Sequence, residues 1–129
     1  MSGESLWQDA KAYDMIDSDI SLTWLGAAYG LMGPGWQGSF RVTHDGESST
    51  IVVLLSEAET EAIATHLGQT KLEKRQAELI LQYGGRELIE AALQAFELPA
   101  EVRIETSEAT LGDDLRRWHV SKAVDGDEP

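Results

Sequence analysis

The sequence predicts an α+β fold. We expect an N-terminal helix, a small antiparallel sheet with an early hairpin and a C-terminal hairpin, and three central helices packed on one face. Three observations lead to this fold class. Apolar residues recur every three or four positions in residues 4–16 and 57–96. They alternate with polar residues in 40–44 and 102–104, and turn-forming residues separate these stretches.

The first expected element is an amphipathic helix over residues 4–16. Its apolar residues are spaced by three and four positions: Leu6, Trp7, Ala10, Tyr13 and Ile16. Aspartates crowd its C-terminal end, where the helix dipole disfavours anions, so the helix should stop near Met15. Between Ile20 and Met32 the periodicity fits a strand or a helix, and we favour a strand that begins near Ile20.

Two turn signals predict antiparallel strands in the next stretch. Gly33-Pro34-Gly35 marks the first turn, and Asp45-Gly46 favours a tight hairpin. Residues 33–38 also fit the letters GxGxxG. A dinucleotide site needs a helix directly after the glycines, however, and here a strand is expected, so we interpret the motif as a turn. The uninterrupted apolar run of residues 51–55 predicts a strand buried on both faces.

Three helices are expected in the middle of the chain. Ser56-Glu57-Ala58-Glu59 is a capping box that opens the first, and residues 70–73 repeat the signature for the second. Gly84-Gly85 should separate the second helix from the third, which places Ile89, Leu93 and Phe96 on one stripe. The expected spans are Glu57–Leu67, Thr70 to about Tyr83, and Arg86–Phe96.

The C-terminal third is expected to contain a hairpin. Val102 and Ile104 alternate with charged residues, which indicates a short strand, and residues 111–114 look like a loop. Residues 115–123 fit either a strand or a helix capped by Asp113, and we favour the strand as the second arm. With 129 residues and 42% hydrophobic content, we expect one domain over 1–124 and a disordered acidic tail at 125–129.

Charge restricts the function more than any motif does. The formal net charge is −13, of which residues 1–69 carry −8 and residues 97–129 carry −5. Such an excess argues against direct nucleic-acid binding, which needs clustered Lys and Arg, and it favours encounter with a basic protein. The chain has no cysteine, which excludes disulfides and thiolate chemistry. No window resembles a signal peptide or a membrane span, so we expect a cytoplasmic location and no membrane association.

These features favour a small acidic, non-enzymatic protein-binding module, such as an inhibitor, immunity protein, adaptor or secretion chaperone. Opposite charge would speed its docking to a basic partner, and a homodimer is compatible with the same features. Among the four tryptophans, Trp36 lies in a predicted turn and is the one we expect to be exposed as an anchor. The candidate partner-binding residues are Trp36, Asp14, Asp17, Asp19, Glu57 and Glu61.

The alternative is a small acid–base enzyme or ligand-binding domain that uses His119 or His66 with nearby carboxylates. No serine lies in a GxSxG turn, and paired carboxylates are more typical of solvated surface, so we assign no catalytic residue. Asp17-Ser18-Asp19 opens like a calcium loop but lacks the glycine and glutamate that such a loop needs. The histidines lack zinc-ligand spacing, and we expect neither a metal site nor a cofactor.

In the order of its expected elements and in its acidity, the chain is similar to type III secretion chaperones. The three central helices depart from the pattern of that family. The resemblance concerns architecture, and it implies a binding role rather than a catalytic one.

Overall fold

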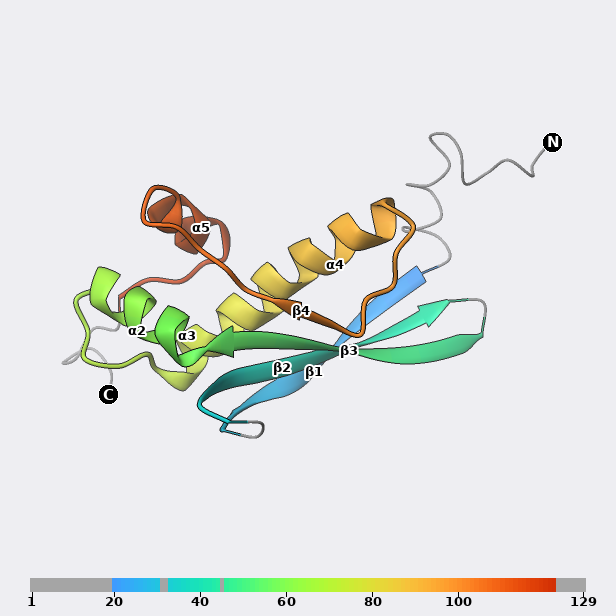
Figure 1. Ribbon diagram of the computed structural model, residues 1–129, viewed down its shortest axis with the longest axis horizontal. Helices are drawn as coiled ribbons and strands as arrows, with labels where there is room; N and C mark the ends of the chain where they lie inside the picture. The colour runs from blue at the N-terminus through green and yellow to red at the C-terminus, as the bar shows by residue number, and fades with distance from the viewer. Residues whose placement is uncertain (1–19, 31–32, 45, 123–129) are drawn as a thin grey trace.

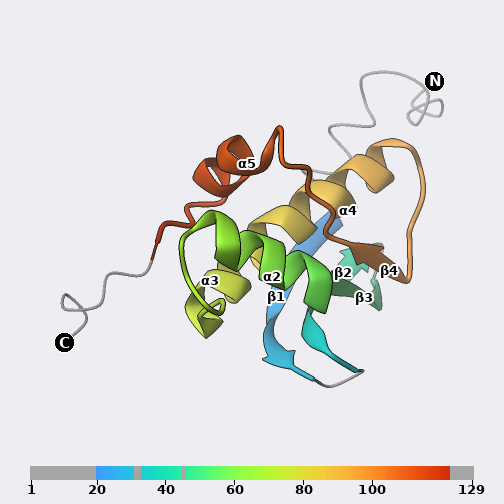
Figure 2. The ribbon, with the colours of Figure 1, turned by 60° about the vertical axis from the view of Figure 1, so that its left-hand side comes forward.

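The computed structural model describes residues 20–30, 33–44 and 46–122. These residues form one four-stranded sheet with the strand order β1-β2-β3-β4, and the helices lie on one side of it (Figures 1 and 2). The α+β class is therefore confirmed. The arrangement predicted within that class is wrong in two respects in the described residues: the sheet is mixed rather than antiparallel, and the C-terminal hairpin is replaced by a strand and a helix. The predicted helix of residues 4–16 lies outside the described residues.

Three strands of ten residues each form an antiparallel meander. They are β1 (Ile20–Tyr29), β2 (Gly35–His44) and β3 (Glu47–Ser56). Pairing runs from Ile20 opposite His44 to Tyr29 opposite Trp36 in the first hairpin, and from Gly35 opposite Ser56 in the second. The two turns predicted for this early stretch are therefore confirmed, since each connection lies at the turn signal that the sequence carries.

The fourth strand, β4 (Glu101–Arg103), joins β3 in parallel, with Val52 opposite Glu101. This pairing overturns the expected antiparallel sheet with its C-terminal hairpin. The chain leaves β3, passes through all the central helices on one face of the sheet, and returns as β4 along the outer edge of β3 (Figure 1). Such a long crossover delivers a strand in the same direction as its neighbour, whereas a hairpin needs a short turn.

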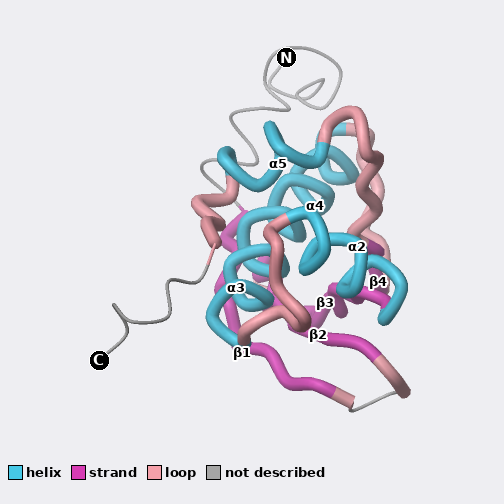
Figure 3. Tube along the Cα trace, turned by 90° about the vertical axis from the view of Figure 1, so that its left-hand side faces the viewer, coloured by secondary structure: helices cyan, strands magenta, loops and turns pink. Residues whose placement is uncertain are grey.

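The sheet has one covered face and one open face. Phe40, Ile51 and Val53 lie under the helices and are at most 1% exposed. Val52 and Leu54 face the other way and are only half-buried, so the expectation that this strand is buried on both faces is wrong. Figure 3 shows the reason, because all helices lie above the same side of the strands. Alternate residues of an antiparallel meander covered on one side face solvent.

The first helix, α2 (Glu57–His66), confirms the prediction to within one residue. Ser56 is its N-cap, and the serine Oγ accepts a hydrogen bond from the Glu59 backbone N–H at 3.2 Å. Thr60 and Ile63 are buried on the side that faces the sheet, so the cap fixes where this helix leaves β3.

The second and third predicted helices are one continuous helical run. It consists of α3 (Lys74–Leu79), the π-helical segment η2 (Ile80–Gly84) and α4 (Gly85–Gln94). The run begins at Lys74 and not at Thr70, because Glu73 and Gln76 form the capping box actually used. Gln76 is only 6% exposed, and its side chain exchanges two hydrogen bonds with Gln69 and donates a third to the Ser121 carbonyl at 2.7 Å. This buried amide ties the start of the run to the C-terminal segment.

Gly84 and Gly85 do not break the run because both have helical φ angles, −67° and −64°. Their lack of a side chain is used for packing instead. A Cβ at Gly84 would lie 3.1 Å from the Trp118 indole, and one at Gly85 would lie 2.8 Å from Val53. The helix can therefore approach the central strand β3 closely at this point.

The π-helical segment keeps one side of this run against the sheet. Buried positions recur every four residues, at Ala77, Leu81, Gly85, Ile89 and Leu93. In a straight α-helix, each step of four residues turns the buried position by about 40° beyond a full circle. The wider turn between Ile80 and Gly84 rotates it back, so both ends of the run contact one core.

Replacing Gly85 by alanine should destabilise the protein by about 1–2 kcal/mol. Overpacking against the fully buried Val53 side chain outweighs the gain in helix propensity that alanine brings. Urea unfolding followed by far-UV circular dichroism measures the difference. If Gly84–Gly85 were simply a helix break, the same substitution would leave the stability unchanged or raise it.

The last helix, α5 (Leu111–Arg117), replaces the strand expected over 115–123 and the loop expected over 111–114. Leu111, Leu115 and Trp118 share one buried helical stripe. Acids stand in its first turn and arginines in its last, which complements the helix dipole. The alternation through Trp118 and Val120 is compatible with a strand, but the buried stripe over about two helical turns decides the structure.

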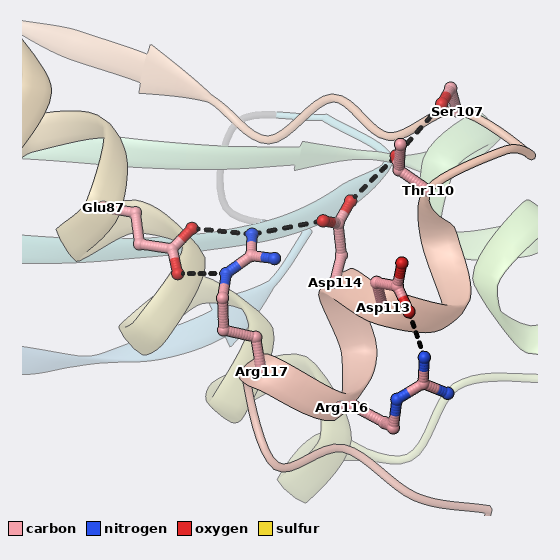
Figure 4. Close-up of polar contacts among 7 residues, drawn as sticks. All are labelled: Glu87, Ser107, Thr110, Asp113, Asp114, Arg116 and Arg117. Carbon is pink, nitrogen blue, oxygen red and sulfur yellow. Dashed lines mark hydrogen bonds and ion pairs between the residues drawn. The ribbon is translucent and has the colours of Figure 1, made fainter.

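An ion pair connects α5 to α4. Arg117 donates two hydrogen bonds to the Glu87 carboxylate, at 2.7 and 2.9 Å, and lies 3.1 Å from Asp114 (Figure 4). The hydrogen bonds from Arg117 lower the pKa of Glu87 below its ordinary value, although partial burial opposes the shift. Both side chains are about half exposed, so the pair orients α5 more than it stabilises the fold.

One continuous core joins the helices to the covered face of the sheet. Its largest fully buried members come from β2, β3, α2, η2 and α4: Phe40, Ile51, Val53, Leu55, Ile63, Ile80, Leu81 and Ile89. Within the described part of the chain, no helix combines the length and the apolar content that crossing a membrane requires.

Candidate functional site: an aromatic and acidic cleft

Two aromatic rings stand side by side at one end of the first hairpin. Tyr29 ends β1 and pairs with Trp36, the second residue of β2. Their ring centroids are 5.3 Å apart with the planes at 70°, an edge-to-face contact. Trp36 is half-buried, whereas 52% of Tyr29 is exposed. The pair therefore presents an apolar wall that water can still reach.

Two carboxylates from α2 lie beside this wall. Glu57 and Glu61 are one helical turn apart, and the Tyr29 hydroxyl donates a hydrogen bond to Glu57 Oε1 at 2.9 Å. Together they border a cleft of about 380 Å³, which is within the usual size of ligand pockets. Its lining residues are Tyr29, Trp36, Glu57, Thr60, Glu61, Ala64, Thr70, Lys71 and Leu72.

The local fold explains why these groups meet. Gly35 pairs with Ser56, and Trp36 and Glu57 are the residues that directly follow the two members of this cross-strand pair. Ser56 caps α2, and Thr60 Oγ1 donates a hydrogen bond to the Ser56 carbonyl at 2.8 Å. The first turn of α2 is thereby fixed against the start of β2, and the carboxylates are held next to the rings.

The Tyr29–Glu57 hydrogen bond changes the ionisation of the phenol. The bond to Glu57 stabilises the protonated phenol and raises the pKa of Tyr29 above its ordinary value, and burial and the negative charge of Glu57 add to the shift. Tyr29 therefore stays a neutral donor well above neutral pH, and it holds one oxygen of Glu57 in place.

Replacing Glu57 by glutamine should return the pKa of Tyr29 toward its ordinary value, because both the charge and the anionic acceptor disappear. Ultraviolet titration of tyrosinate formation measures the change, and Tyr29→Phe identifies the Tyr29 signal among the three tyrosines. Glu61→Gln serves as the matched control, since Glu61 acts on Tyr29 through charge alone and is the weakest of the causes. A shift as large in that control would disprove the specific role of the Glu57 hydrogen bond.

The structure brings together three of the residues nominated from the sequence, namely Trp36, Glu57 and Glu61. Trp36 is half-buried instead of exposed, because its ring packs on Tyr29 and on the edge of the core. The other three candidates, Asp14, Asp17 and Asp19, lie outside the described residues. Whether these residues bind a partner stays a prediction.

Sequence reasoning missed Tyr29 and Lys71, both of which line the cleft. Tyr29 could have been found from the hairpin itself, because a turn over residues 30–35 places positions 29 and 36 opposite each other. Lys71 lies in the connection between α2 and α3, and no local pattern in the sequence indicates which side of α2 that connection follows.

The histidines of the alternative function lie elsewhere. His119 has a left-handed φ of 64°, and its ring contacts Tyr83 edge-to-face at 5.2 Å. The two aspartates that precede it in α5 are engaged by arginines, Asp113 by Arg116 and Asp114 by Arg117 (Figure 4). No contact between His119 and either carboxylate therefore supports a base paired with an acid.

His66 lies in the last turn of α2 and borders a shallow groove with acidic residues. One of these, Glu59, accepts a hydrogen bond from Thr106 at 2.7 Å and is a structural partner. Within residues 20–30, 33–44 and 46–122, no three His, Asp or Glu side chains are placed to hold a metal ion.

Comparison with family models, with curated proteins and with solved structures gave no match to this chain.

Proposed function

We propose that the protein is an acidic, non-enzymatic binding module that engages a basic partner protein through the aromatic and acidic cleft. The observation that carries this proposal is the meeting of Trp36 and Tyr29 with Glu57 and Glu61 in one cleft. Inhibitors, immunity proteins, adaptors and secretion chaperones are the kinds of protein that act in this way.

The chemistry of the cleft fits a lysine or arginine side chain of the partner. The aliphatic stem of such a side chain can pack on the aromatic wall, while its charged end reaches the carboxylates. A cation near the face of a tryptophan adds about 0.5–2 kcal/mol, depending on how far it is desolvated. The net charge of −13 would in addition accelerate encounter with a basic surface.

Binding to short peptides tests the proposal directly. The protein is titrated with a panel of lysine- and arginine-containing peptides, and with acidic peptides of equal length, by isothermal titration calorimetry at low and high salt. Basic peptides should bind at low salt and weaken as salt rises. Glu57→Gln/Glu61→Gln should weaken binding about tenfold, which is about 1.4 kcal/mol, and Trp36→Leu should weaken it several-fold.

Two further variants make the result specific to the cleft. Glu47→Gln/Glu97→Gln removes the same two charges at the opposite end of the sheet and should leave affinity nearly unchanged. Lys71→Ala removes the one basic side chain that lines the cleft among the described residues, and it should strengthen binding of basic peptides. Equal losses in both double-glutamine variants, or no binding of any basic peptide, would overturn the proposal.

A further inference from the structure

A second and larger cleft lies at the opposite end of the sheet. It is an apolar groove of about 440 Å³, lined by residues from the end of α4, from the connection after it and from the sheet, including Ile20 at the start of β1. The end of α4 and the start of β1 lie at the same end of the molecule (Figure 1). Five of its lining residues are apolar: Ile20, Val42, Leu93, Phe96 and Leu98. Among the described residues, His44, Glu47, Ser49 and Glu97 also line the groove and supply its polar edge.

Phe96 is held over this groove in a strained conformation. Its φ is 62°, and the residue ends α4 by donating its backbone N–H to the Leu93 carbonyl at 2.9 Å. Glycine usually occupies this left-handed position, and other residues incur about 1–2 kcal/mol there. Phe96 is 55% exposed and Leu98 is 53% exposed, so two large apolar side chains meet solvent at one place. A strained backbone that holds large apolar side chains in solvent indicates that this surface binds another group.

Chain connectivity points to the occupant. We propose that this groove takes the apolar side chains of residues 6–16 of the same molecule. Ile20 is itself a wall of the groove, so the preceding segment necessarily starts there. Ile16 is four residues away and can lie no more than about 14 Å from Ile20, even along a fully extended chain.

The composition of this segment matches the groove. Leu6, Trp7, Tyr13 and Ile16 provide side chains large enough to cover Phe96 and Leu98. Lys11 is the one basic residue among residues 1–19, and the groove carries acidic side chains at Glu47 and Glu97. A short tether raises the effective concentration of the segment at the groove to the millimolar range. Occupation by its own chain is therefore favoured over occupation by a second copy.

Disulfide trapping in the full chain tests this, since the protein has no cysteine of its own. Ala10→Cys is combined with Glu97→Cys at the edge of the groove, and oxidation is followed by non-reducing electrophoresis and mass spectrometry. The matched control combines Ala10→Cys with Ser48→Cys. Ser48 pairs with Thr43, which pairs with Ser21 beside Ile20, so Ser48 also lies near the start of β1 but on the open face of the sheet.

We expect the intramolecular disulfide of the Glu97 pair to form at least about ten times faster than that of the Ser48 pair. Adding Phe96→Ser/Leu98→Ser should reduce the rate to that of the control. Both side chains are more than half exposed, so the fold should persist, which far-UV circular dichroism verifies. Equal rates in the two pairs would overturn the proposal. Disulfides formed mainly between molecules, at a rate that rises with concentration, would overturn it in favour of a second copy.

Discussion

Replacing Gly35 by alanine should lower the free energy of unfolding by about 3–5 kcal/mol, the sum of backbone strain and overpacking. Gly35 has a φ of 118°, which residues with a side chain rarely adopt. A Cβ there would lie 2.5 Å from the Leu55 carbonyl oxygen and 3.1 Å from the Glu57 backbone nitrogen. Both neighbours are backbone atoms, so neither can move without displacing β3 or the start of α2.

Urea unfolding of Gly26→Ala provides the matched control. Gly26 has the same φ of 118°, but nothing lies within 4 Å of a Cβ at that position. Its substitution should cost only the conformational strain, about 1–2 kcal/mol. The difference in unfolding free energy between the two variants measures the steric clash at Gly35. Equal losses of stability would show that this clash adds nothing to the effect of Gly35→Ala. Because Gly35 precedes Trp36, its substitution should also disturb the aromatic wall of the cleft.

Trp118→Ala should destabilise the protein by a similar amount, about 3–5 kcal/mol, as expected for truncation of a large buried aromatic side chain. Trp118 is 4% exposed and lies at the end of α5, with its indole over Gly84 of the π-helical segment. Ile104 Cδ1 lies at the same place, but Gly84 itself has no side chain that could fill the space of the indole. The truncation therefore leaves a cavity between α5 and the helical run.

Two controls separate this packing from the nearby charges. Trp118→Phe keeps much of the volume and should lose less than half as much stability, as measured by urea unfolding with circular dichroism. Glu87→Gln removes the ion pair with Arg117 and should cost less than about 1 kcal/mol, because both partners are about half exposed. The folded state lowers the pKa of Glu87, so its contribution exists above the pKa of the unfolded chain and fades as the pH falls through the lowered value. If the loss of unfolding free energy in Trp118→Ala decreased with falling pH in the same way, that loss would have to be attributed to the ion pair and not to packing.

Elements determined by neighbouring residues were predicted well from the sequence. The hairpins follow from Gly33-Pro34-Gly35 and Asp45-Gly46, and α2 begins at its serine cap. In each case the turn or cap residue acts on backbone groups a few positions away, so a window of sequence contains the information.

Elements whose structure depends on residues far away in the sequence were not predicted correctly. Gly84-Gly85 is a break signal by composition, but Val53 and Trp118 pack where a side chain would be, and both come from other parts of the chain. The same holds for β4, whose direction depends on the course of the crossover before it. For residues 115–123 the strand and helix periods were both satisfied locally, and burial of Leu111 with Leu115 decided between them.

The candidate site was predictable in part for the same reason. Glu57 and Glu61 are recognisable as neighbours because they are four residues apart on a helix with a clear start. Their meeting with Trp36 depends on the pairing of Gly35 with Ser56, which requires the register of the second hairpin. The exposure of Trp36 was overestimated because the position of Tyr29 across the hairpin was not considered.

The short strand β4 has a consequence for how the chain folds. Its pairing of Val52 with Glu101 closes a loop of about fifty residues, whereas the two hairpins close over a few. The meander can therefore form early, while the apolar edge of β3 still lacks its neighbour and is open to pairing with other chains. Once in place, β4 gives the sheet an edge that carries Glu101 and Arg103, paired at 3.2 Å. Three residues added last thus convert an aggregation-prone edge into a charged one.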